Sequence, residues 1–268
     1  MIDYVDANTF ADFAHFRLNP NFTGDNVQWN SEITKQNSIV FVKKGLISMF
    51  FDHVKNSAFK HILITHLADD AIDENTFNSK PASIVKWFAE NAVYNHPDLI
   101  PIPFGLENHF GICTEGHPGR FAHFIENLET FKNNPKDTKV VYCNWSIANN
   151  VGDRSNIPEK LKVNYVWEQG ILFDKYYHRA STFKFIIAPP GNGVDAQRQW
   201  EAIYMGCIPI VIKNNIYKEY VDLPLIQVND YSEVTYELLE QYLNKEYKYD
   251  MVYMSYWKER LVYEFNKL

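Results

Sequence analysis

One stretch decides the fold of this sequence: Lys184-Phe-Ile-Ile-Ala-Pro-Pro-Gly-Asn-Gly-Val-Asp-Ala-Gln-Arg-Gln-Trp-Glu-Ala-Ile-Tyr-Met-Gly-Cys-Ile-Pro-Ile-Val-Ile-Lys213. It begins with an apolar run of strand length, continues through a glycine-rich turn into a segment with helical apolar spacing, and ends in a second apolar run. A strand–turn–helix–strand unit of this kind places free backbone N–H groups and the positive end of a helix at the mouth of a cleft. Phosphate groups bind at such a position.

Bulk composition narrows the class of protein. The chain has 268 residues, 46% of them hydrophobic and 16% aromatic, which is enough for two modest α/β domains with packed cores. The formal charge of −7 argues against a dedicated nucleic-acid-binding surface. The three cysteines, Cys113, Cys143 and Cys207, are too few for a disulfide framework or a zinc site. Since no targeting segment or membrane-length apolar run is visible, we expect a soluble, cytoplasmic protein.

Short apolar runs alternate with amphipathic segments along the whole chain, which is the pattern of βαβ units and parallel sheets. We expect strands at residues 38–42, 62–65, 99–102, 139–143, 185–188, 209–212 and 225–228. We expect helices at residues 46–54, 83–91, 120–133, 173–181, 195–205, 235–243 and 250–266. A polar break at 133–137 suggests a first domain at 1–135, a second at 136–249 and a closing helix at 250–268 that braces the first domain.

The glycine-rich turn matches a dinucleotide fingerprint. Gly191-Asn-Gly193-Val-Asp-Ala196 fits the GxGxx(G/A) pattern. However, the motif lies far from the first βα turn of the chain, and the following strand ends in Lys213-Asn-Asn215, where an NAD site has an acidic residue for the ribose. This context disfavours an NAD-linked oxidoreductase, which we keep as a third hypothesis.

The helix after the turn carries two polar side chains on one face. Arg198 stands in the first turn, where its planar guanidinium is placed to clamp a diphosphate. Glu201 lies one turn deeper, where its carboxylate is placed to accept hydrogen bonds from ribose hydroxyls. The alternative is an exposed i,i+3 ion pair, which contributes only a few tenths of a kcal/mol.

Residues 185–211 resemble the signature of the exostosin-type glycosyltransferases. The shared features are the strand, the glycine-rich turn, Asp195 shortly before Arg198, the Trp-Glu-Ala that contains Glu201, and the Gly206-Cys-Ile-Pro209 entry into the next strand. Two positions depart from the pattern, because Pro190 and Gln197 stand where an arginine and a histidine are frequent. The resemblance implies an α/β protein of GT-B architecture, in which two Rossmann-like domains with mostly parallel sheets face a central cleft.

The resemblance also implies the chemistry: inverting, metal-independent transfer of a sugar, with xylose or galactose as guesses, from a UDP-sugar to a hydroxyl of a glycan acceptor. Arg198 would contact the diphosphate and Glu201 the ribose, and Gly191 and Gly193 would let the backbone approach the phosphates. Three neighbours on the same loop belong to this donor site: Pro190, Asn192 and Asp195. Because the chain also lacks the Asp-x-Asp motif of metal-dependent glycosyltransferases, we expect no metal and no cofactor other than the nucleotide sugar.

A second loop points to the same cleft. It follows the strand at 139–143 and faces the donor in GT-B enzymes. Arg154 would supply a further positive charge against the departing nucleoside diphosphate, and Asn144 and Ser146 would bind sugar or phosphate oxygens. The alternative is a solvated loop in which Asp153 and Arg154 begin the next helix.

The general base has to come from the first half, because an inverting transfer needs a group that takes the proton of the acceptor hydroxyl. The segment after the strand at 62–65 offers Asp73, Asp69 and His66, in our order of preference. The alternative for Asp73 is a helix cap. If none of these residues acts as a base, the chain is a non-catalytic nucleotide-sugar or glycan-binding module of GT-B descent. The oligomeric state stays open.

Overall fold

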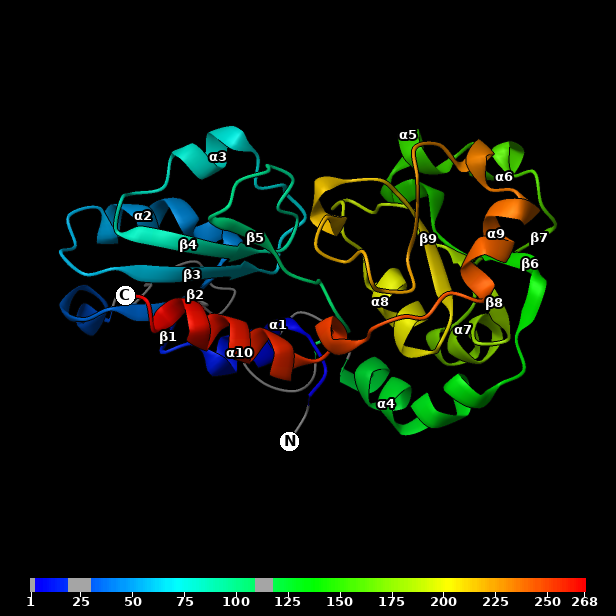
Figure 1. Cartoon of the computed structure of the whole chain (residues 1–268), viewed down its shortest axis with the longest axis horizontal. Helices are drawn as coiled ribbons and strands as arrows, with labels where there is room; N and C mark the ends of the chain where they lie inside the picture. Colours follow the sequence, from blue (N-terminus) through cyan, green and yellow to red (C-terminus); the bar gives the residue numbers. More distant parts are fainter. Residues whose placement is uncertain (1–2, 19–29, 109–117) are drawn as a thin grey trace.

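The computed structural model describes residues 3–18, 30–108 and 118–268, which form two parallel sheets of five strands each, side by side (Figure 1). The first sheet has the order β1-β2-β3-β4-β5. Its strands are β1 (Phe16–Leu18), β2 (Ser38–Lys43), β3 (His61–His66), β4 (Ile84–Ala89) and β5 (Leu99–Pro101).

Consecutive strand order decides how the first sheet is covered. Right-handed crossovers between successive parallel neighbours all fall on one face, and here they carry α2 (Ile47–Val54) and α3 (Glu74–Asn78). The opposite face is covered by α1 (Ala7–Phe13) and α10 (Met254–Phe265), which come from the two ends of the chain (Figure 1). Both faces of the strands are therefore buried, which explains their continuous apolar runs.

The second sheet has the order β10-β9-β8-β6-β7. Its strands are β6 (Asp137–Cys143), β7 (Tyr165–Trp167), β8 (Phe183–Ile187), β9 (Ile208–Ile212) and β10 (Ile226–Val228). In chain order this is the doubly wound arrangement 2-1-3-4-5, because β6 lies between its two successors. The direction of winding reverses between β6 and β8, and a ligand crevice forms at the carboxyl ends of the strands at such a switch point.

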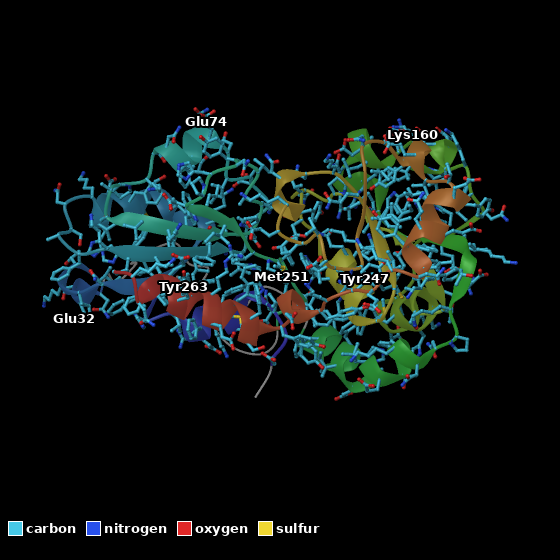
Figure 2. All side chains as sticks on the ribbon, viewed as in Figure 1. Glu32, Glu74, Lys160, Tyr247, Met251 and Tyr263 are labelled. Atoms are coloured by element: carbon cyan, nitrogen blue, oxygen red, sulfur yellow. The ribbon has the colours of Figure 1, made fainter. Side chains whose placement is uncertain are left out.

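Six helices pack around the second sheet among the described residues: α4 (Pro118–Asn133), α5 (Val151–Arg154), α6 (Ile157–Lys160), α7 (Phe173–Ala180), α8 (Gln197–Tyr204) and α9 (Tyr236–Leu243). Although the expected boundary assigns α4 to the first domain, this helix packs on α7, with the rings of Phe124 and Tyr177 4.8 Å apart. Short 3-10 helices occupy Ser31–Lys35, Lys44–Leu46, Ile147–Asn149, Asn215–Tyr217, Tyr231–Glu233 and Asp250–Val252. Figure 2 shows Met251, in the last of these, where the chain crosses back to the first half.

Sequence and structure differ in one long element. The helix expected at residues 83–91 is wrong, since this segment forms β4. Its β-branched and aromatic side chains suit a strand, and it pairs with β3 on one side and β5 on the other. The expected strands at 38–42, 62–65, 99–102, 139–143, 185–188, 209–212 and 225–228 are confirmed within two residues at each end. Within the described ranges, no helix has both the length and the apolar character to span a bilayer.

Candidate functional site

A cavity of about 340 Å³ lies at the carboxyl ends of β6 and β8, where the strand order places a crevice. The second half lines it with Ser146, Asn149, Arg154, Gly191, Asn192, Gly193, Asp195, Ala196, Gln197 and Arg198. The facing wall consists of Asp69, which follows β3, Phe104, which follows β5, and Arg120 of α4. The cavity is therefore bounded by both halves of the chain.

Arg154 is a buried cation in this wall, and only 4% of the residue is exposed to solvent. Its guanidinium donates to three backbone carbonyls, those of Pro190 at 2.6 Å, Ser146 at 2.8 Å and Pro189 at 3.3 Å. Over the described part of the chain it forms no ion pair with a carboxylate. Burial lowers its pKa, and the nearby charge of Arg198 lowers it further. An anion in the cavity would offset both effects.

Arg198 is half-buried in the first turn of α8. Its Nε donates to the hydroxyl of Tyr176 at 3.3 Å, and its guanidinium lies 5.5 Å from the centre of that ring. The i,i+3 pair with Glu201 considered from the sequence does not form, and Arg198 has no carboxylate partner in the described ranges. Two guanidinium groups without carboxylate partners thus face one cavity, which is a favourable arrangement for a phosphate or diphosphate.

Glu201 is placed differently from the ribose-binding role that the resemblance implies. The residue is 1% exposed and does not line the cavity. Its Oε1 accepts hydrogen bonds from Arg120 Nη2 at 2.8 Å and from the Tyr177 hydroxyl at 2.7 Å. Its Oε2 is buried and has no hydrogen-bond partner among the residues that the structure describes. Glu201 therefore pairs with a cavity-lining residue, Arg120, which no motif in the sequence marks as functional.

Asp195 connects the two halves rather than presenting a free carboxylate. Its Oδ2 accepts from the backbone N–H of Phe104 at 2.7 Å, and its Oδ1 accepts from the Trp200 indole at 2.9 Å and from the Gln199 amide. Its own N–H donates to Asn91 Oδ1 at 2.8 Å. Burial raises the pKa of this carboxyl to about 7, although the Phe104 and Trp200 donors act in the opposite direction.

The glycine-rich turn packs against the first half. A Cβ atom on Gly193 would lie 2.9 Å from Asn91 Nδ2 and 3.1 Å from the Asp69 carbonyl oxygen. A Cβ on Gly191 would lie 3.3 Å from Arg154 Nη2. Pro190 contributes the carbonyl that holds Arg154, and Asn192 is an exposed residue of the cavity wall. The turn therefore lets two loops and an arginine approach closely around the cavity.

Only one of the three predicted bases lines the cavity, and it is Asp69. Asp73 caps α3, where its carboxylate accepts from the Thr76 N–H at 2.8 Å, and this bond lowers its pKa. His66 is 1% exposed, with Nδ1 2.8 Å from Glu90 Oε2. Burial alone would lower the pKa of His66, but the carboxylate of Glu90 outweighs it and the pKa is raised.

The loop after β6 is divided between two roles. Ser146 lines the cavity, whereas the Asn144 side chain donates to the Glu168 carbonyl at 2.8 Å and lies outside it. Asn150 fixes the turn by donating to the Gly191 carbonyl at 3.0 Å. A second cavity of about 270 Å³ adjoins the first across this turn, with Val194, Ile212 and Tyr217 as its apolar lining. The two cavities together can hold a ligand that has an anionic and a less polar part.

A scan of the chain against protein-family models finds no match, and a search of curated proteins finds none either. Among residues 3–18, 30–108 and 118–268, no group of three His, Cys, Asp or Glu side chains is arranged to hold a metal ion.

Proposed function

We propose that the chain is a glycosyltransferase of GT-B architecture that moves a sugar from a nucleotide sugar to a hydroxyl group of a glycan. The observation that carries this proposal is the pair Arg154 and Arg198, which line one cavity without a carboxylate partner in the described chain, together with Asp69 of the first half. Two parallel sheets whose carboxyl ends bound this cavity support the GT-B assignment.

In the proposed reaction, the acceptor oxygen forms a bond to the anomeric carbon while the bond from that carbon to the diphosphate breaks. Arg154 and Arg198 stabilise the charge that develops on the departing diphosphate. Asp69 accepts the proton of the acceptor hydroxyl, since it lines the cavity from the opposite half and is exposed. Attack from the side opposite the leaving group inverts the anomeric centre.

Calorimetry with UDP tests the donor site. Arg154→Gln and Arg198→Gln should each weaken UDP binding by about tenfold or more, because each removes a charge-assisted contact. Arg179→Gln is the matched control, since Arg179 pairs with Glu168 at 3.0 Å and does not line the cavity. Wild-type affinity in both test variants would refute the donor site.

Release of UDP from a panel of UDP-sugars, with and without glycan acceptors, tests catalysis. Asp69→Asn should retain UDP affinity and lose about a hundredfold or more in turnover, which is in the range of general-base catalysis. Asp70→Asn is the matched control, because that neighbouring carboxylate is exposed and lies 3.7 Å from Lys44 instead. Donor binding without turnover in the wild-type protein would favour the non-catalytic binding module.

A further inference from the structure

We infer that Arg120 is a third ligand for the diphosphate and that Glu201 is a positioning residue that holds Arg120 in place, with no contact to the nucleotide. This inference rests on the proposed donor site. It departs from the sequence-based expectation, in which Glu201 binds the ribose and Arg120 has no role.

Arg120 is the cavity residue that connects Glu201 to the solvent-accessible space. It reaches the cavity from α4, whereas Arg154 and Arg198 belong to α5 and α8. Its side chain is 25% exposed, compared with 2% for the side chain of Glu201. A ligand in the cavity therefore meets the guanidinium of Arg120 before it can meet the carboxylate of Glu201.

Two hydrogen bonds and a ring contact hold the Arg120 guanidinium from α7 and α8. Its Nε donates to the Tyr177 hydroxyl at 2.6 Å, its Nη2 donates to Glu201 Oε1 at 2.8 Å, and its centre lies 5.7 Å from that of the Tyr177 ring. The charge of Glu201 raises the pKa of Arg120 despite burial, so the guanidinium stays charged. A long, flexible side chain is thus fixed before the ligand arrives, which lowers the entropic cost of binding.

The same contacts leave one end of the guanidinium available. Among the described residues, the edge formed by Nε and Nη2 is occupied by Tyr177 and Glu201, whereas Nη1 forms only the longer ion pair with Glu107, at 3.9 Å. The N–H groups on Nη1 can therefore donate to an anion in the cavity. Glu201 Oε1 already accepts from two donors, and the carboxylate as a whole is buried outside the cavity lining, with a side chain only 2% exposed, which argues against a direct contact with a ribose hydroxyl.

Inorganic pyrophosphate separates the two roles of Glu201, because it has phosphates but no ribose. Binding of pyrophosphate and of UDP should be measured by calorimetry for the wild type, Arg120→Gln and Glu201→Gln. If Glu201 acts through Arg120, each of the two variants lowers the affinity for UDP and the affinity for pyrophosphate by a similar factor, about tenfold. The double variant should then be no weaker than Arg120→Gln alone, because the two residues act as one unit.

Two outcomes of this experiment would contradict the positioning role of Glu201. If Glu201→Gln weakens UDP but leaves pyrophosphate at wild-type affinity, Glu201 contacts the nucleoside and the inference is wrong. Wild-type affinity for both ligands in Arg120→Gln would also overturn it. The ratio of the two affinities within one variant does not depend on the fraction of folded protein. Tyr177→Phe gives a second test, since it removes the hydroxyl that holds Arg120. This variant should lower the affinity for UDP and the affinity for pyrophosphate by a similar factor.

These outcomes are distinguishable from failure of the proposed donor site. If Arg154→Gln and Arg198→Gln weaken pyrophosphate binding while Arg120→Gln and Glu201→Gln do not, the donor site is supported and only the role of Arg120 is wrong. If the wild-type protein does not bind pyrophosphate, the anion site itself is refuted and the inference falls with it. Arg179→Gln again serves as the control, because it changes an Arg–Glu pair outside the cavity.

Discussion

Gly193 is the position where a single methyl group should separate the two halves of the molecule. The Cβ atom of Gly193→Ala would lie 3.1 Å from the Asp69 carbonyl oxygen, 3.3 Å from Asp69 Cα and 2.9 Å from Asn91 Nδ2. Two of these atoms are backbone, so the clash is relieved only if the loops move apart by a few tenths of an ångström. Overpacking of this kind typically costs about 1–3 kcal/mol.

The expected result is a decrease of about 1–3 kcal/mol in the free energy of unfolding, measured by urea denaturation. Turnover should decrease by more than the fraction of unfolded protein accounts for, because the shifted backbone carries Asp69, the proposed base. Gly45→Ala is the matched control: its Cβ would meet no atom within 4 Å, so this substitution should leave the protein unchanged or stabilise it by about 0.4–1 kcal/mol. Equal stability and turnover in the Gly193 and Gly45 variants would refute the close approach of the two loops.

Three further predictions follow from the site. The free energy of unfolding should decrease as the pH rises from about 4 to 7. The cause is Asp195, whose native pKa of about 7 keeps a proton that an unfolded aspartate with a pKa of 3.8 has released. The slope from this group is at most about 1.4 kcal/mol per pH unit, and Asp195→Asn should remove it. Asp73→Ala should leave turnover unchanged while amide exchange in α3 accelerates, and a large loss of turnover would restore Asp73 as the base. EDTA should leave UDP binding and turnover unchanged, because Arg154 and Arg198 provide the positive charge; loss of activity that Mg²⁺ or Mn²⁺ restores would contradict this.

The sequence predicted the elements whose local pattern is strong. The strand–turn–helix–strand unit at 184–213 forms β8, α8 and β9, because its apolar runs are buried on both faces of the sheet. The apolar spacing of the segment at 83–91 suits a helix as well as a strand, and only its pairing with β3 and β5 decides between them. The strand order, which locates the crevice, is a tertiary property that no local pattern contains.

The candidate site shows the same division between local and tertiary information. Placing Arg198 in the first turn of α8 needed only helical spacing, and that placement is confirmed. The partners of Glu201 are not predictable in this way, because Arg120 and Tyr177 come from α4 and α7 and nothing in their local sequence indicates contact with α8. Similarly, the sequence ranks Asp73 ahead of Asp69 as the base, whereas in the structure Asp73 caps α3 and Asp69 lines the cavity.

The turn after β8 couples ligand binding to the contact between the halves. Its carbonyls at Pro189 and Pro190 hold Arg154, and the next residues, Gly193 and Asp195, contact Asp69, Asn91 and Phe104 of the first half. A movement that separates the halves therefore also displaces the carbonyls that orient Arg154. An anion bound to Arg154 and Arg198 would stabilise the arrangement that the turn has in the structure, by the ordinary linkage between binding and conformation. Because the same turn contacts Asp69, a bound donor would also stabilise the proposed base in its position at the cavity.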